Sequence, residues 1–152
     1  MLTLLVFSSS PFAYAAADVP EVQITVHSNG YYYETVIEDE PTPLSPLMKA
    51  ATKTTTKKKS KTTYYKNSAG KVMWYVKVTG TFKYGNGSAT CTAASVKAAS
   101  ENSAWTVHDA SASRSGNAAI GSATGKQHDH GLIINTVKQK VTLKCSATGQ
   151  FS

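Results

Sequence analysis

The sequence TVKQKVTLKCSAT at residues 136–148 alternates with a period of two. Its odd positions are mostly apolar and include Val141, Leu143 and Cys145, while every even position is polar. Successive side chains of a β-strand point to opposite faces, so this pattern predicts a strand with one face on a core and the other in water. Cys145 should therefore point inward, toward the strand that carries Cys91, the only other cysteine.

The rest of the region 62–152 shows further short strands without any helical pattern. The longest, at 71–84, places Trp74, Val76 and Val78 on one parity and lysines on the other. Turns rich in Gly, Asn and Ser separate the strands at 67–70, 85–88, 113–117 and 128–131. Six or seven short antiparallel strands joined in this way predict an all-β fold, specifically an immunoglobulin-like β-sandwich.

The two cysteines predict one disulfide, between Cys91 and Cys145. Both occupy inward strand positions, and an even number of cysteines suits an oxidising compartment. The bond would close a loop of 55 residues. Loop-entropy arguments put the stabilisation at about 4 kcal/mol. Two buried, reduced thiols are the alternative.

The first segment, 1–17, predicts a signal peptide whose start is truncated. An apolar run at Leu2–Phe7 precedes a Ser-Ser-Ser-Pro break and small residues such as Ala13-Tyr14-Ala15, a pattern that signal peptidase cleaves. A buried N-terminal strand is the alternative. No later stretch approaches the roughly 18 apolar residues of a membrane span, so the product is expected to be secreted and extracellular.

Charge divides the chain of 152 residues into two unequal parts. Six acidic and no basic residues occur up to Met48, whereas sixteen basic and three acidic residues follow. Residues 18–48 are therefore predicted to be an acidic leader or arm, with an added edge hairpin as the alternative, and residues 49–61 a solvated Lys/Thr-rich linker. Either the acidic part screens the basic part, or the basic part meets an external polyanion.

The linker and one sheet face supply a candidate polyanion-binding surface. Its members are lysines that could pair with phosphates or carboxylates, and one tyrosine that could stack on sugars. They are Lys49, Lys53, Lys57, Lys58, Lys59, Lys61, Tyr75, Lys77 and Lys83. An ordinary solvated face is the alternative. The predicted partner is an anionic polysaccharide or teichoic acid, with no specific nucleic acid.

Other polar residues suggest no catalytic, cofactor or metal site. His128-Asp129-His130 is the densest cluster, but neighbouring loop residues without a distant third ligand rarely bind metal. Asp109 shares parity with Trp105 and is predicted to be partly buried. No Gly-x-Ser-x-Gly motif or pair of glycosidase carboxylates is evident, so the sequence favours a protein that is not an enzyme.

Four segments together resemble small secreted proteins of Gram-positive gut bacteria. They are YKNSAGKVMW at 65–74, GTFKYGNG at 80–87, SASRSGN at 111–117 and VTLKCSATG at 141–149. The resemblance covers about residues 54–152 and implies export and a Cys-containing β-sandwich. Its matching residues are turns and cysteines, so no catalytic residue carries over.

Two functions remain open on the sequence. The first is a secreted, cationic, non-enzymatic protein that binds anionic cell-wall or glycan polymers. The second is a secreted antibacterial effector, similar to a bacteriocin, whose acidic leader masks a basic domain until processing. Further cleavage between Pro41 and Lys49 would favour the effector, whereas a mature chain that begins near Asp18 would favour the binding protein.

Overall fold

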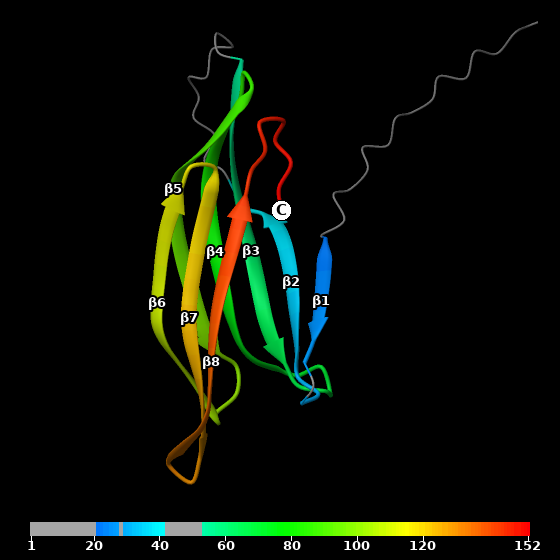
Figure 1. The fold of residues 1–152 in the computed structure, drawn as a ribbon, viewed down its shortest axis with the longest axis vertical. Coiled ribbons are helices and arrows are strands. Elements are labelled where there is room, and N and C mark those ends of the chain that lie inside the picture. Colours follow the sequence, from blue (N-terminus) through cyan, green and yellow to red (C-terminus); the bar gives the residue numbers. More distant parts are fainter. Residues whose placement is uncertain (1–20, 28, 42–52) are drawn as a thin grey trace, which may run out of the picture.

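A computed structural model describes residues 21–27, 29–41 and 53–152. All regular structure in these ranges is β-strand, and the predicted all-β class is confirmed (Figure 1). The eight strands are β1 (Val22–Val26), β2 (Tyr32–Asp39), β3 (Thr54–Lys66), β4 (Val72–Gly85), β5 (Ser88–Ser100), β6 (Trp105–Ser115), β7 (Ala118–Asp129) and β8 (Leu132–Lys144).

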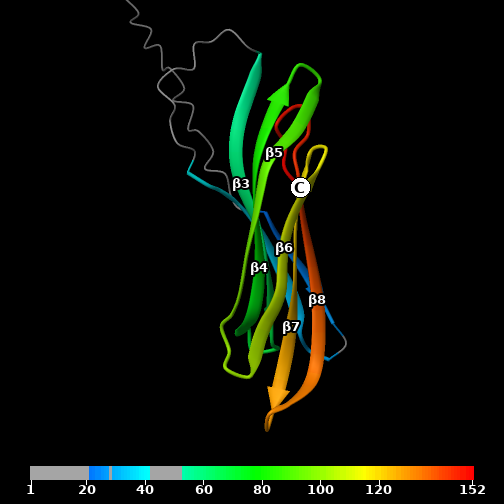
Figure 2. The ribbon, with the colours of Figure 1, turned by 90° about the vertical axis from the view of Figure 1, so that its left-hand side faces the viewer.

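The strands form two antiparallel sheets that pack face to face (Figures 1 and 2). Sheet A has the order β1-β2-β3-β4-β5, and sheet B has the order β6-β7-β8. Neighbours in each sheet are consecutive in the chain. Immunoglobulin domains instead use Greek-key connections. The molecule is therefore sandwich-like, but its strand order differs from the predicted immunoglobulin arrangement.

The core lies between β4 and the two strands β7 and β8. On β4, Trp74, Val76, Val78 and Phe82 are almost completely buried. β7 opposes them with small residues, and a Cβ atom added at Gly125 would lie 2.4 Å from Cε2 of Trp74. Bulky side chains on one sheet thus fit against a nearly bare backbone on the other, which brings the sheets close together.

The predicted alternation of the last strand is confirmed. Val141, Leu143 and Cys145 are buried, with exposed fractions of 3%, 0% and 0%. Lys140 and Lys144, of the opposite parity, are exposed. The long strand predicted at 71–84 is also found, and it turns into β5 through Asn86 and Gly87, both at positive φ, as hairpin turns of this type require.

The described residues before Lys61 differ from the prediction because they belong to sheet A. Residues 22–26 and 32–39 form β1 and β2, as the edge-hairpin alternative expected. Residues 54–61, predicted as a solvated linker, form the first part of β3 and pair with both β2 and β4. Threonine favours strands, and acids of β2 offset the repulsion between the lysines. The predicted signal peptide at 1–17 lies outside the described residues.

The predicted disulfide is absent, since Cys91 and Cys145 are both free thiols. Each sulfur instead donates to a carbonyl of its own chain segment, Cys91 Sγ to Ala93 O at 3.2 Å and Cys145 Sγ to Ser146 O at 3.4 Å. Both residues are buried in one core, as predicted. The β6–β7 turn joins their backbones, because Cys91 N donates to Gly116 O and Cys145 N to Asn117 O.

Candidate polyanion-binding surface

The lysines of β3 are divided between the two faces of sheet A. Lys57, Lys59 and Lys61 pair with Phe82, Gly80 and Val78, so they share the inner face with the core. Sheet B covers mainly β4 and β5 and touches β3 through β8 (Figure 1). Lys59 is only 8% exposed. Burial also lowers the pKa of the Lys61 ammonium. These side chains are part of the packed structure and do not form a solvated arm.

Acidic residues of β2 and the residue after it neutralise several of the predicted binding lysines. Asp39 lies 3.5 Å from Lys57 Nζ and 3.3 Å from Lys59 Nζ. Glu40 lies 2.5 Å from Lys77 Nζ, and this hydrogen bond lowers the pKa of Glu40 and raises that of Lys77. For these three lysines the structure shows the first alternative that the charge distribution left open, in which the acidic part of the chain screens the basic part.

The remaining predicted residues do not form one cluster. Lys58 and Lys83 are diagonal neighbours on the outer face of sheet A, because Lys58 pairs with Thr81 and Lys83 with Thr56. Tyr75 lies farther along β4, where its ring is 5.9 Å from that of Tyr64. Lys53 is exposed before β3, and Lys49 lies outside the described residues. The predicted surface is thus dispersed over both faces of sheet A.

Sheet B carries a second set of lysines, which sequence reasoning did not assign to binding. Register places four lysines on its outer face: Lys126, Lys138, Lys140 and Lys144. We call these four residues the lysine face. Within the described part of the chain none of them forms an ion pair. The even-position lysines at 138, 140 and 144 were visible in the sequence, but alternation shows only that they face water.

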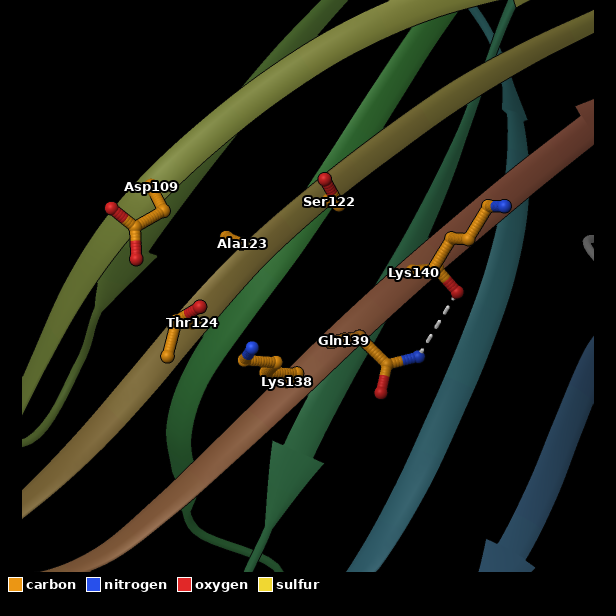
Figure 3. A pocket seen from close by; sticks show the side chains of 7 residues that line it. All are labelled: Asp109, Ser122, Ala123, Thr124, Lys138, Gln139 and Lys140. Atoms are coloured by element: carbon orange, nitrogen blue, oxygen red, sulfur yellow. Dashed lines mark hydrogen bonds between the residues drawn. The ribbon is translucent and has the colours of Figure 1, made fainter.

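A shallow hollow of about 370 Å³ lies in the middle of the lysine face (Figure 3). Asp109 of β6, Ser122, Ala123 and Thr124 of β7, and Lys138, Gln139 and Lys140 of β8 line it. Cross-strand pairing sets Lys138 beside Thr124 and Lys140 beside Ser122. Ser122 Oγ is hydrogen-bonded to Ser111 Oγ at 2.9 Å. The hollow thereby combines the Lys138 side chain with the hydroxyls of Ser122 and Thr124, a combination that suits phosphate or carboxylate oxygens.

Asp109 is exposed, and the prediction that it is partly buried is wrong. A β-bulge between His108 and Ser111 inserts one extra residue into β6 and reverses the side-chain parity. Asp109 is itself at a φ of 54°, the left-handed region that Asp tolerates. The bulge thereby places the carboxylate at the margin of the lysine face.

Two histidines meet on the same outer face, nearer the β7–β8 turn. Thr106 Oγ1 lies 2.9 Å from His108 Nε2 and 2.8 Å from His128 Nε2. His130, which the sequence grouped with His128, instead contacts Asp129 at the turn, 2.9 Å away. Within the described residues no group of three or more His, Cys, Asp or Glu side chains could hold a metal ion. Alternation along one strand indicates which face His108 occupies, but it cannot reveal a partner on another strand.

No known protein family, curated protein or solved structure matches the chain. Across residues 21–27, 29–41 and 53–152, no helix is long and apolar enough to cross a membrane. The exposed surface of sheet B carries the lysine face, whose four lysines form no ion pair in the described part of the chain.

Proposed function

We propose that this protein is a secreted, non-enzymatic binding protein that associates with anionic cell-wall or glycan polymers through the lysine face. The observation that carries the proposal is the placement of four lysines on one side of sheet B, beside hydroxyl groups and only one carboxylate, Asp109. The acids that neutralise Lys57, Lys59 and Lys77 lie on the other sheet.

The shape of the face favours a polymer over a small ligand. Alternate residues on one side of a strand are about 7 Å apart, so Lys138, Lys140 and Lys144 form a row about 20 Å long. An extended chain with repeated negative charges, such as teichoic acid or an acidic glycan, can contact all three at once. Such contacts weaken with salt because they are exposed to solvent.

The same face offers little for catalysis. Hydrolysis of a glycosidic bond commonly uses two carboxyl groups that flank the bond. Asp109 is the one carboxyl group that lines the hollow beside the lysine face. The two histidines nearby share the Thr106 hydroxyl. We therefore propose binding without chemical conversion, and no cofactor.

Co-sedimentation with purified Gram-positive cell walls tests the proposal. The triple variant Lys138→Gln/Lys140→Gln/Lys144→Gln should lose at least tenfold in apparent affinity at low salt. A matched triple variant, Lys71→Gln/Lys83→Gln/Lys97→Gln, removes the same charge from exposed positions elsewhere and should bind nearly as the unmodified chain does. Walls stripped of teichoic acid, and high salt, should abolish binding. Equal losses in both variants, or no binding at low salt, would refute the proposal.

One observation favours the antibacterial effector as a second candidate. Glu34, Asp39 and Glu40 form ion pairs with four lysines of β3 and β4, as a masking segment would. Cleavage between Pro41 and Lys49 would break the covalent link between these acidic residues and the basic strands. Killing assays on related bacteria, with the intact chain and the cleaved chain side by side, distinguish the two functions. Killing only after cleavage supports the effector, whereas wall binding without killing supports the binding protein.

A further inference from the structure

The β7–β8 hairpin ends in a tip, residues 129–134, that exposes three consecutive aliphatic side chains. Leu132, Ile133 and Ile134 are 71%, 54% and 57% exposed. Exposed single apolar residues are ordinary on protein surfaces, but three in succession at one projecting end are not.

The tip projects beyond the rest of the sandwich. Pairing between β6 and β7 begins at Trp105 and Gln127, and His128 N donates to Ala104 O just before β6, so the residues after His128 have no neighbour on that side in the ladder. The two-residue turn His130–Gly131, at φ values of 46° and 80°, closes the hairpin tightly. Figures 1 and 2, which view the molecule at right angles, both show this hairpin at one end of the long axis, past the loops of sheet A.

The aliphatic residues lie on both sides of the hairpin. Leu132 and Ile133 are consecutive strand residues, so their side chains point to opposite faces. A register shift at Gln127/His128 leaves Ile134 as the extra residue of a bulge. A flat protein partner would cover one side only and leave the other in water. An apolar medium that surrounds the tip would cover both sides.

Charges around the tip complement an anionic surface. Lys126 is three residues from the end of β7, or about 10 Å from the turn, a depth that matches lipid headgroups when the tip enters a bilayer. Lys138 follows on β8 about 20 Å from Leu132. The one carboxylate of the tip, Asp129, is 2.9 Å from Nδ1 of its neighbour His130, which offsets its charge when the imidazole is protonated.

From this arrangement we infer that the hairpin tip inserts into the surface of an anionic lipid bilayer, with Lys126 at the headgroups. The protein then contacts the membrane at one end. Strands β7 and β8 run away from the membrane, so most of the lysine face lies outside the bilayer. The membrane contact and the proposed binding to wall polymers share Lys126, but the aliphatic residues of the tip are not part of the lysine face, so variants of the tip separate the two.

Vesicle binding tests the inference. The full chain should bind vesicles of phosphatidylglycerol and phosphatidylcholine in a 1:1 ratio, and should bind pure phosphatidylcholine at least tenfold more weakly. The variant Leu132→Ser/Ile133→Ser/Ile134→Ser should lose at least tenfold in affinity for the anionic vesicles. The matched variant Val22→Ser/Ile24→Ser/Val26→Ser removes three equally exposed aliphatic residues from β1 and should stay within twofold of the unmodified chain.

The variant Ile133→Trp tests whether the hairpin tip enters the bilayer. The fluorescence emission of the introduced tryptophan should shift to the blue on vesicle binding. The native Trp74 and Trp105 are 1% and 3% exposed and contribute a constant background. Absence of the shift, equal loss in both serine variants, or concentration-dependent dimers that disappear in the tip variant would overturn the inference. Wall binding distinguishes the two proposals, because the tip variant should retain it and the triple lysine variant of the lysine face should lose it.

Discussion

Lys59 and Asp39 are direct cross-strand partners on β3 and β2, and their charged groups lie 3.3 Å apart. The Lys59 ammonium also lies 5.3 Å from the centre of the Phe151 ring. One lysine of a low-complexity run thereby connects the acidic N-terminal strand to the C-terminal end of the chain. This contact explains why a sequence rich in lysine can occupy the middle of a sheet.

The variant Asp39→Asn should lower the free energy of unfolding by about 1 kcal/mol, because it removes the carboxylate that faces both Lys57 and Lys59. The loss should shrink in high salt. Urea unfolding at two salt concentrations measures it. Asp129→Asn, which alters an exposed pair with His130, is the control and should have little effect. Equal losses in both variants would show that the Asp39 pairs contribute nothing specific.

Close approach of the two sheets depends on Gly125. An alanine there would place its Cβ 2.4 Å from the Trp74 ring, so Gly125→Ala should destabilise the protein by about 3 kcal/mol. Gly116→Ala is the comparison, since its Cβ would meet nothing within 4 Å and only the φ of 55° opposes it. That variant should cost about 1 kcal/mol. Thermal unfolding ranks the two, and a reversed order would contradict the packing described for β4 and β7.

Thiol reactivity follows from the burial of Cys91 and Cys145. Burial raises the pKa of both thiols, so little thiolate is present at pH 8. Burial also keeps reagents away from both sulfur atoms. A thiol reagent such as Ellman's should react with neither cysteine in the folded chain and with both in denaturant. Absence of reaction in denaturant without a reductant would instead show that the two sulfurs are covalently paired.

The Glu40–Lys77 pair should make stability depend on acid pH. The hydrogen bond from Lys77 holds the pKa of Glu40 below its ordinary value of 4.5, so its stabilisation is complete above that value. It is lost as the pH falls through the lower pKa of the folded state. Glu40→Gln should therefore be less stable than the unmodified chain by up to about 1 kcal/mol at pH 6.

That difference should shrink as the pH falls below 4.5 toward 3, because protonation of Glu40 removes the charge that Lys77 stabilises. Urea unfolding at the two pH values provides the measurement. Glu38→Gln, at an exposed position of β2 two residues before Glu40, serves as the control for a general loss of negative charge. A difference that stays constant between pH 6 and pH 3 would show that the effect of Glu40 is not electrostatic.

Local alternation was sufficient to predict several strands and the faces of their side chains. The period of two at 136–148 required Leu143 and Cys145 to share one face and Lys140 and Lys144 the other. Asn86-Gly87 likewise required a tight turn, because these residues tolerate positive φ. Both features depend on neighbours along the chain, so they could be predicted without knowing what the strands pack against.

Local alternation could not predict which strands pair or which charged residues contact each other across strands. The register of β2 against β3 pairs Asp39 with Lys59 and turns the expected linker into a strand. A single bulge moves Asp109 to the surface, and pairing of β6 with β7 brings His108 to His128. The lysine face also exists only because sheet B stands apart from the acidic strand β2. These relationships join residues far apart in sequence, and local propensity carries no information about such long-range pairing.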